Sequence, residues 1–485
     1  MAIPTCAPAS DGKLTAVIGN LPPGLGNPLT SGGFPPLLIW PALFDALSQI
    51  GADGELKPTL ATSWRVENPT TWIFDLRPGV TFSNGEPFDA EAVMGTVNFL
   101  RSESGRRFSA YREVQTIQDM RARGPLTLEI TTTQPDSMLA HKLAGVWILP
   151  PKYFAQVGAE RFALQPIGTG PYTAAKWNSA KLDLTPFAGS WRKPRLAGLT
   201  IRALPEATSR AQAIISRAAD IAFDLDLEDI EAVEAAGARI DLRKRAAVQA
   251  WQYITELPSP LQDARVRLAL NLAVDRQSIV DTILQGRTRV PSQVAAVGVF
   301  GHDDTLAPYP YDSARAKALL AEAGYPDGFD ATFQIYTDGP ADASIYQQAV
   351  ADLAKVGVRI KIARVTPQVN NEGLYNGKWA GIAFNMNWGS LPSLDIVAAL
   401  RYHSCLWPTP WICRPEIVDL MKAADAEFDR DKRKAVIRQI LRALHDDPPA
   451  ILLFENIHPD GIGPRVLGYD APFGFIRYES LSAKD

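Results

Sequence analysis

The residues that most often carry enzyme chemistry are few and scattered in this chain of 485 residues. The histidines show no metal-ligand spacing such as HExxH, and no Gly-x-Ser-x-Gly nucleophile elbow occurs. The acidic pairs Asp303-Asp304 and Asp446-Asp447 would point apart on a helix or strand. We therefore expect no catalytic residue, no metal site and no cofactor; a peptide or glycoside hydrolase with a dispersed active site is the alternative. The five histidines are His141, His302, His403, His445 and His458.

Residues 165–172, read QPIGTGPY, contain a Gly-x-Gly that invites comparison with a phosphate-binding loop. Such a loop needs backbone N–H groups that converge at the start of a helix, with a third glycine or a Lys-Ser/Thr pair close behind. Here Pro171 removes one donor, and no Ser or Thr follows Lys176. The residues that follow read as hairpin strands. We therefore interpret the two glycines as a tight turn and predict no nucleotide site.

Cysteine chemistry is limited to three residues. Cys405 and Cys413 bracket the segment LWPTPWI, and a disulfide that closes this short loop is plausible. Such a bond would imply an oxidising compartment, whereas two buried thiols are the alternative that spacing alone leaves open. Cys6 has no obvious partner.

Composition excludes several classes of function. Hydrophobic residues make up 46% of the chain, charged residues 21%, and the formal net charge is −4. This balance is typical of a soluble globular protein and gives no electrostatic argument for a nucleic-acid or anionic-membrane partner. The N-terminal segment MAIPTC lacks the basic and apolar regions of a signal peptide. Either the protein is cytoplasmic, as a chaperone or scaffold would be, or an export signal has been removed.

The elements that position these residues alternate between strands and helices. Trp72, Phe74 and Leu76 alternate as in a half-buried strand, and Asp89 is a good N-cap for the helix that follows. Asp263 begins a helical pattern that runs to Gly286. This alternation over such a length predicts two or three α/β lobes with mixed sheets. Further helices are expected at 312–323, 417–424 and 436–444, and further strands at 126–131, 200–203, 358–362 and 450–454.

Six segments in the expected order resemble the family 5 extracellular solute-binding proteins, which are the dipeptide-, oligopeptide- and nickel-chelate-binding components of ABC importers. The order of the motifs is more specific than any one of them. The glycine segment matches the family's turn, which answers the nucleotide question. The matching segments are 60–64 (LATSW), 71–93 (TWIFDLRPGVTFSNGEPFDAEAV), 167–172 (IGTGPY), 264–276 (ARVRLALNLAVDR), 311–326 (YDSARAKALLAEAGYP) and 353–358 (LAKVGV).

The resemblance implies a two-lobed periplasmic-binding-protein fold (type II, cluster C) that closes over its ligand. Lobe I would comprise residues 1–34, 166–250 and 461–485, with an extra subdomain at 35–165. Lobe II would comprise 251–460, with hinges near 250 and 460. The resemblance also implies a location outside the cytoplasmic membrane, a removed signal peptide, a Cys405–Cys413 disulfide, permease subunits as partners and a monomeric state.

A ligand site of aromatic walls and a few polar anchors is expected from the same resemblance. Trp251, Trp388, Trp407 and Trp411 fall where the family lines its cleft, and each could instead be a core residue. The predicted ligand-binding residues are Trp251, Tyr253, Asn385, Asn387, Trp388, Tyr402, His403 and Trp407.

One departure from the family bears on the ligand. Dipeptide binders have an Asp three residues after a Trp, where it pairs with the substrate ammonium group, but Leu391 stands three residues after Trp388. Asp395 could substitute, although a helix cap is its simpler role. His403 could touch a metal chelate, as in the nickel-binding branch, or be a hydrogen-bonded loop residue. We expect a small polar organic solute, such as a modified peptide or an opine- or sugar-conjugate-like compound, with a metal chelate as the alternative.

Overall fold

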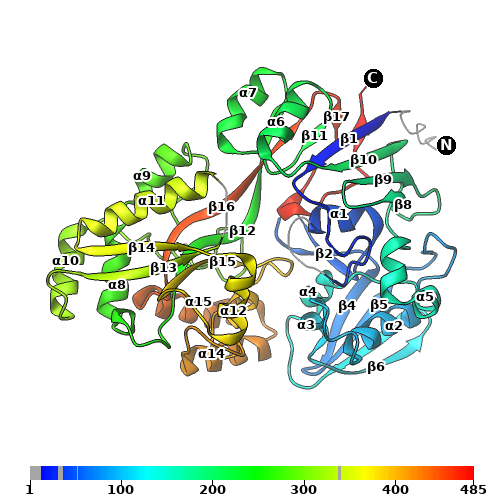
Figure 1. The fold of residues 1–485 in the computed structure, drawn as a ribbon. Coiled ribbons are helices and arrows are strands. Elements are labelled where there is room, and N and C mark those ends of the chain that lie inside the picture. The colour runs from blue at the N-terminus through cyan, green and yellow to red at the C-terminus, as the bar shows by residue number, and fades with distance from the viewer. Residues whose placement is uncertain (1–11, 31–35, 52, 337–339, 485) are drawn as a thin grey trace. The chain divides into compact units, whose positions relative to one another are not determined.

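The structure is a computed structural model that describes residues 12–30, 36–51, 53–336 and 340–484. The chain divides into two compact units: unit 1 is Met1–Lys244 with His458–Asp485, and unit 2 is Arg245–Ile457. It passes from one unit to the other within two long strands, β12 (Arg239–Tyr253) and β16 (Ala450–Ile462) (Figure 1). The lobe and subdomain boundaries expected from the sequence stay predictions. Cys6 lies outside the described residues.

The main sheet of unit 1 is mixed, as expected for an α/β protein. Its strands are β1 (Lys13–Ile18), β8 (Tyr172–Trp177), β9 (Lys181–Pro186), β10 (Gly198–Ala203) and β11 (Ile221–Ala222). β1 is parallel to β10 and β11, whereas β9 is antiparallel to β8 and β10. Helices α6 (Ala207–Ile215) and α7 (Ile230–Ala235) pack here, and Val17, Ala211 and Val233 meet in the core between them and β1.

A second, antiparallel sheet in unit 1 has the order β4-β5-β7-β6. Trp72, Phe74 and Leu76 are buried in β5 as predicted, but Ile73 is buried too, so the strand is covered on both faces rather than half-buried. Asp89 caps α2 by accepting from the Ala92 N–H at 3.2 Å, as predicted. These strands and helices are β4 (Ala61–Asn68), β5 (Thr71–Leu76), β6 (Ile117–Gly124), β7 (Thr127–Thr132), α2 (Ala90–Arg101), α3 (Tyr111–Val114), α4 (Leu139–Lys142) and α5 (Pro151–Leu164). The short elements of unit 1 are α1 (Pro36–Leu43), β2 (Ser48–Ile50), β3 (Leu56–Pro58), β17 (Val466–Leu467) and β18 (Ser482–Ala483).

The glycine segment before β8 packs against the end of α1. A Cβ on Gly168 would lie 2.0 Å from the Leu43 carbonyl oxygen, and one on Gly170 would lie 2.5 Å from the Leu43 carbonyl carbon. The Gly170 N–H donates to the Leu43 oxygen at 2.9 Å. Both glycines are therefore required by the close approach of two backbone segments, and a strand follows them rather than the helix of a phosphate loop.

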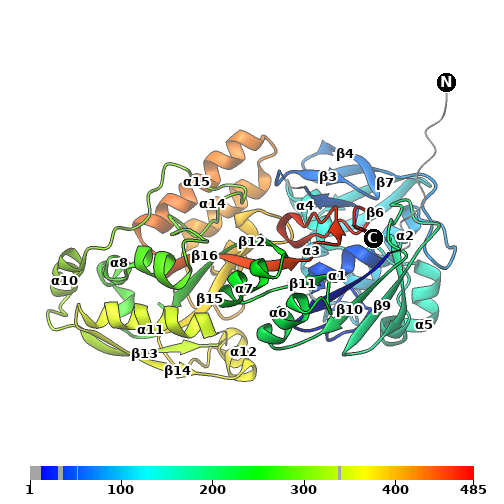
Figure 2. The same ribbon diagram turned by 90° about the horizontal axis from the view of Figure 1, so that it is seen from above.

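The sheet of unit 2 has the order β14-β13-β15-β12-β16. β13 (Phe329–Ile335) is parallel to β14 (Val358–Arg364) and to β15 (Ala383–Gly389), whereas β15 is antiparallel to β12. Helices α14 and α15 lie side by side in both ribbon views (Figures 1 and 2). The helices of unit 2 are α8 (Ala264–Ala273), α9 (Arg276–Ser278), α10 (Ser313–Glu322), α11 (Pro340–Ala354), α12 (Pro367–Asn376), α13 (Ile396–Tyr402), α14 (Pro415–Ala426) and α15 (Arg430–Asp446).

The helical pattern predicted from Asp263 to Gly286 is interrupted. Asp263 caps α8 as expected, by accepting from the Arg265 N–H, but Val274 is extended, with φ −97° and ψ 122°. Asp275 then caps a new helix by accepting from the Ser278 N–H at 3.0 Å. A side chain that can bond the backbone in a non-helical conformation favours such a break, and the apolar spacing alone does not report it. No helix in the described ranges combines the length and the hydropathy needed to cross a bilayer.

Candidate ligand-binding site

The predicted ligand-binding residues all lie in unit 2, on β12, on β15 and in the segment from α13 onward. In the antiparallel β12–β15 pair, Trp251 lies opposite Asn385, and Val248 lies opposite Trp388. Residues directly opposite one another share a face of the sheet, and successive residues along a strand alternate between faces. The structure therefore divides the predicted residues between the two faces. The first face carries Trp251, Tyr253, Asn385 and Asn387; the second carries Gln252, Phe384, Met386 and Trp388.

On the first face, Trp251 and Asn385 make structural contacts. The buried Trp251 ring stacks on Tyr346 of α11 with centroids 5.1 Å apart and planes 20° apart. It also meets Phe333 of β13 edge-on at 5.1 Å. The Asn385 amide exchanges two hydrogen bonds of 2.6 Å with the backbone N–H and carbonyl of Tyr336. Asn385 thus ties the end of β13 to β15.

Tyr253 is also a core residue on this face. Its hydroxyl donates to the Arg267 carbonyl at 3.1 Å and accepts from the Asn271 amide at 3.2 Å. Burial raises the pKa of the Tyr253 hydroxyl well above its ordinary value, because the charged form would lose its hydration. Asn387, toward the end of β15, is half-buried.

The second face carries a cluster of stacked rings. Trp388 lies face to face with His403, with centroids 3.7 Å apart and planes 18° apart. Trp411 meets the His403 ring edge-on at 5.2 Å and the Phe384 ring edge-on at 5.2 Å. All four side chains are buried. The structure thus brings two predicted residues, Trp388 and His403, into direct contact and adds Trp411 to them.

His403 is an uncharged member of this cluster. Burial lowers the pKa of its imidazole to about 3, and a hydrogen bond with the Asn387 backbone offsets only part of that effect. The ring is therefore neutral at physiological pH. His403 lies just after α13 and hydrogen-bonds the Asn387 backbone, which agrees with its simpler interpretation, and its ring is also buried in the cluster.

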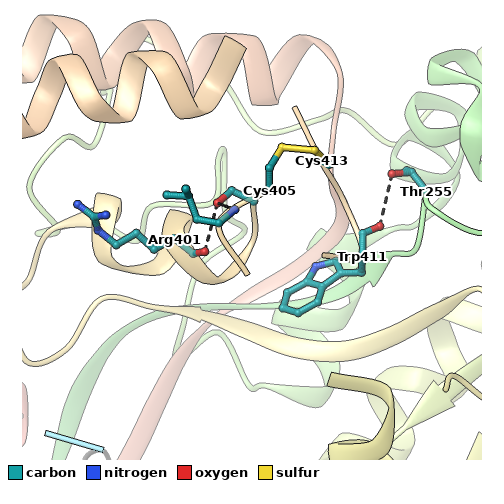
Figure 3. Close-up of a disulfide and its surroundings, with 7 residues drawn as sticks. Thr255, Arg401, Cys405, Trp411 and Cys413 are labelled. Carbon is teal, nitrogen blue, oxygen red and sulfur yellow. Dashed lines mark hydrogen bonds between the residues drawn. A yellow bond between two sulfur atoms is a disulfide. The ribbon is translucent and has the colours of Figure 1, made fainter. Parts of the chain in front are cut away.

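Tyr402 and Trp407 lie at a half-exposed edge near this cluster. The Trp407 indole N–H donates to the Leu374 carbonyl of α12 at 2.7 Å, and its ring lies 4.9 Å from the Tyr402 ring. The loop that contains Trp407 is closed by the Cys405–Cys413 disulfide (Figure 3), so the bond favoured by the resemblance is confirmed.

Trp411, in the same loop, is anchored to the end of β12. Its carbonyl accepts from the Thr255 N–H at 2.8 Å and from the Thr255 hydroxyl at 3.4 Å, the second of which is drawn in Figure 3. The disulfide and this hydrogen bond fix a loop that packing alone would hold less tightly.

Asp395 does not replace the carboxylate that is missing at Leu391. Asp395 caps α13 by accepting from the Val397 N–H at 2.8 Å, and it pairs with the buried Arg433. The capping role proposed for Asp395 is correct. With its second oxygen engaged by Arg433, the side chain has no charge left to offer a ligand ammonium group.

Tyr346, from α11, was not identified from the sequence, and it supports Trp251. Trp411 was placed at the family's cleft by the resemblance but was left out of the predicted ligand-binding residues, and it joins the ring stack of Trp388 and His403. Strict alternation along β12 and β15 would have indicated two separate faces. Local residue spacing could not have predicted the contact between Trp251 and Tyr346, because α11 lies almost a hundred residues further along the chain.

The described residues contain no group of three or more His, Cys, Asp or Glu side chains that could hold a metal ion. A groove of about 680 Å³ lies in unit 2 at the N-terminal ends of β13 and β14, and none of the predicted site residues lines it. The groove is lined by Pro258, Ser259, Pro260, Asp330, Ala331, Thr332, Arg359, Ile360, Lys361, Gly381 and Ile382.

Comparison with known proteins gives a family match. The sequence model of the family described as "Bacterial extracellular solute-binding proteins, family 5 Middle" matches residues 55–404 of this chain. The chain is 28% identical over 330 residues to the glutathione-binding protein GsiB of Salmonella paratyphi A. That match covers 66% of this chain and spans 63% of the length of GsiB.

Two solved structures share the fold. DppA from Helicobacter pylori, in complex with the peptide STSA, superposes with a TM-score of 0.83 at 22% sequence identity. The superposition covers 98% of this chain and 99% of the DppA chain. AgaA from A. tumefaciens R10, in complex with agropinic acid, superposes with a TM-score of 0.82 at 21% sequence identity. The superposition covers 98% of this chain and 99% of the AgaA chain. At these identities the similarity establishes the fold, and it confirms the α/β architecture expected from the sequence.

Proposed function

Because the chain belongs to the bacterial extracellular solute-binding proteins of family 5, we propose that it is the substrate-binding component of an ABC-type importer. It captures a small polar organic solute and delivers it to membrane permease subunits. The family match over residues 55–404 carries this proposal. The chain works by differential binding: the solute favours the conformation with which it makes more contacts, and no bond is made or broken.

The solute class follows from the charges around Trp388. Leu391 supplies no carboxylate, Asp395 is held by Arg433, and His403 is neutral. A buried ammonium group placed here would lack a charge partner, which is costly. A modified peptide or an opine-like or sugar-conjugate compound is therefore favoured over a peptide held by its free amino end. The relative GsiB is named for glutathione, and the AgaA structure holds agropinic acid.

Localisation and partners complete the proposal. The chain acts outside the cytoplasmic membrane, after removal of a signal peptide, as a monomer. A net charge of −4 gives it no electrostatic attraction for nucleic acid. Its macromolecular partners are the permease subunits.

A thermal-shift panel tests the function. The panel holds S-methylglutathione, agropinic acid, a nickel–histidine complex and a set of dipeptides. A solute present at 100 times its Kd stabilises the folded state by about 2.7 kcal/mol, and the melting temperature then rises saturably. We expect this for at least one solute that is recovered chemically unchanged. Turnover of a solute or of a chromogenic hydrolase substrate, with no saturable shift, would instead support the hydrolase.

A further inference from the structure

Four buried polar atoms on the second face have no hydrogen-bond partner within the described part of the chain. They are the indole Nε1 atoms of Trp388 and Trp411, Nδ1 of His403 and Oε1 of Gln252. The side chains that carry them are 0%, 1%, 6% and 0% exposed. A buried polar atom without a partner is expensive, so such atoms in a native protein call for an explanation.

These four side chains are neighbours. Trp388 stacks on His403, and Trp411 meets the edge of the same imidazole. Gln252 lies on β12 directly opposite Phe384, which contacts Trp411. The set therefore occupies one patch, made by the second face and the disulfide-closed loop.

Hydrogen bonds and the disulfide hold the side chains of the patch in place. The Gln252 amide nitrogen donates to the Met386 carbonyl at 2.7 Å, which fixes its oxygen. Trp411 is held through its backbone by Thr255, and its loop by Cys405–Cys413. Groups fixed in this way lose little entropy when a ligand binds.

The hydrogen-bonding capacity of the patch is specific. An indole N–H can only donate, and the Gln252 oxygen can only accept. A neutral imidazole nitrogen can do either, depending on the tautomer. The buried carboxylates of this region are engaged, Asp395 at the start of α13 with Arg433 and Asp425 of α14 with Arg401. Two obligate donors, one acceptor and no net charge match an uncharged amide, whose carbonyl accepts and whose N–H donates.

We infer that Gln252, Trp388, His403 and Trp411 form a neutral subsite that binds an amide group of the solute and discriminates against a free ammonium group. This inference rests on the proposed function and narrows its ligand to solutes with a blocked amino end. The Gln252 oxygen accepts the amide N–H, and the indoles donate to the amide carbonyl.

A matched pair of ligands tests the subsite. S-methylglutathione carries a free α-ammonium group, and N-acetyl-S-methylglutathione carries an amide at the same nitrogen. Both lack a thiol and so leave the Cys405–Cys413 disulfide intact. Calorimetric titration should show the N-acetyl compound binding at least about tenfold more tightly. Equal affinities, tighter binding of the free amine, or binding of neither compound would overturn the subsite.

Two variants separate a binding role from a structural one. Trp411→Phe removes an N–H that has no protein partner together with part of a buried ring, so the melting temperature of the free protein should fall by the loss of packing alone and by less than in Trp72→Phe, which also loses a hydrogen bond. Affinity for the N-acetyl compound should fall about tenfold, the order expected for one hydrogen bond to a buried group. Trp72→Phe is the control, because the Trp72 indole donates to the Asp136 carbonyl at 3.1 Å: it should lower the melting temperature and leave affinity unchanged. Unchanged affinity in Trp411→Phe would refute the inference. The thermal-shift panel tests the proposed function independently of the subsite. Binding of agropinic acid or of the nickel complex, without a preference for the N-acetyl compound, would contradict the subsite and leave the proposed function intact.

Discussion

The assignment of Asp395 as a structural residue leads to a quantitative prediction for Asp395→Asn. Asparagine retains the N-cap hydrogen bond to the Val397 N–H, so the substitution removes only the charge that pairs with Arg433. Arg433 is 4% exposed, donates to the Ala424 carbonyl at 3.0 Å and lies 5.1 Å from the Phe300 ring. It would be left as a buried cation without a counter-charge.

Breaking such a buried pair costs about 3–5 kcal/mol. For a unit the size of Arg245–Ile457, 1 kcal/mol shifts the melting temperature by about 2–4 °C, so the shift should be roughly 6–20 °C. Calorimetry and urea unfolding measure it. Asp419→Asn is the matched control, since Asp419 and Lys422 are 76% and 67% exposed and their pair is expected to contribute little. Asp395→Asn should leave solute affinity unchanged. A small loss of stability with a large loss of affinity would refute the reasoning and restore Asp395 as a ligand anchor.

Three further outcomes are expected. Thiol titration of the denatured, unreduced protein should find one free thiol, and three free thiols would contradict the disulfide. The double variant Cys405→Ser, Cys413→Ser should lose about 2–3 kcal/mol of stability, because the bond closes a loop with a sequence separation of eight residues. Trp388→Phe should keep the fold but weaken solute binding and reduce the solute-dependent change in tryptophan fluorescence, and unchanged solute affinity would remove the residue from the site. Trp388→Ala should cost about 3–5 kcal/mol of stability, because the ring is fully buried. Loss of hydration acts to raise the pKa of the half-buried Asp224, but Arg243 and His458 lower it below its ordinary value. This carboxylate therefore stabilises the fold above pH 3.8, and that stability is lost as the pH falls below this value. Acid unfolding of Asp224→Asn should depend less steeply on pH than that of the wild type, and identical curves would exclude the contribution.

Much of the fold can be predicted from local chemistry. The alternation of Trp72, Phe74 and Leu76 identified β5, and capping by Asp89 and Asp263 placed two helix starts. Each signal depends on residues within one turn or one strand, where sequence and structure correspond directly. The interruption at Val274 was not predicted, because the apolar pattern continues through it in the sequence. Asp275 ends the first helix there by capping a second one.

The candidate site was harder to predict, because its geometry depends on tertiary contacts. The family resemblance placed Trp251 and Trp388 in one pocket, yet the β12–β15 register puts them on opposite faces of a sheet. Trp251 is supported by Tyr346 of α11, and Trp388 by His403 beyond α13. The unpartnered nitrogen of Trp411 becomes visible only when every neighbour of the ring is known.

The identity and fate of a bound solute test the central claim most directly. Native mass spectrometry of the intact protein, followed by analysis of what denaturation releases, measures both. We predict one solute per chain, exchangeable with an excess of a competing solute and chemically identical before and after incubation with the protein. A chain that holds no solute from the panel at any concentration, or that returns a solute altered by bond cleavage, would contradict the account.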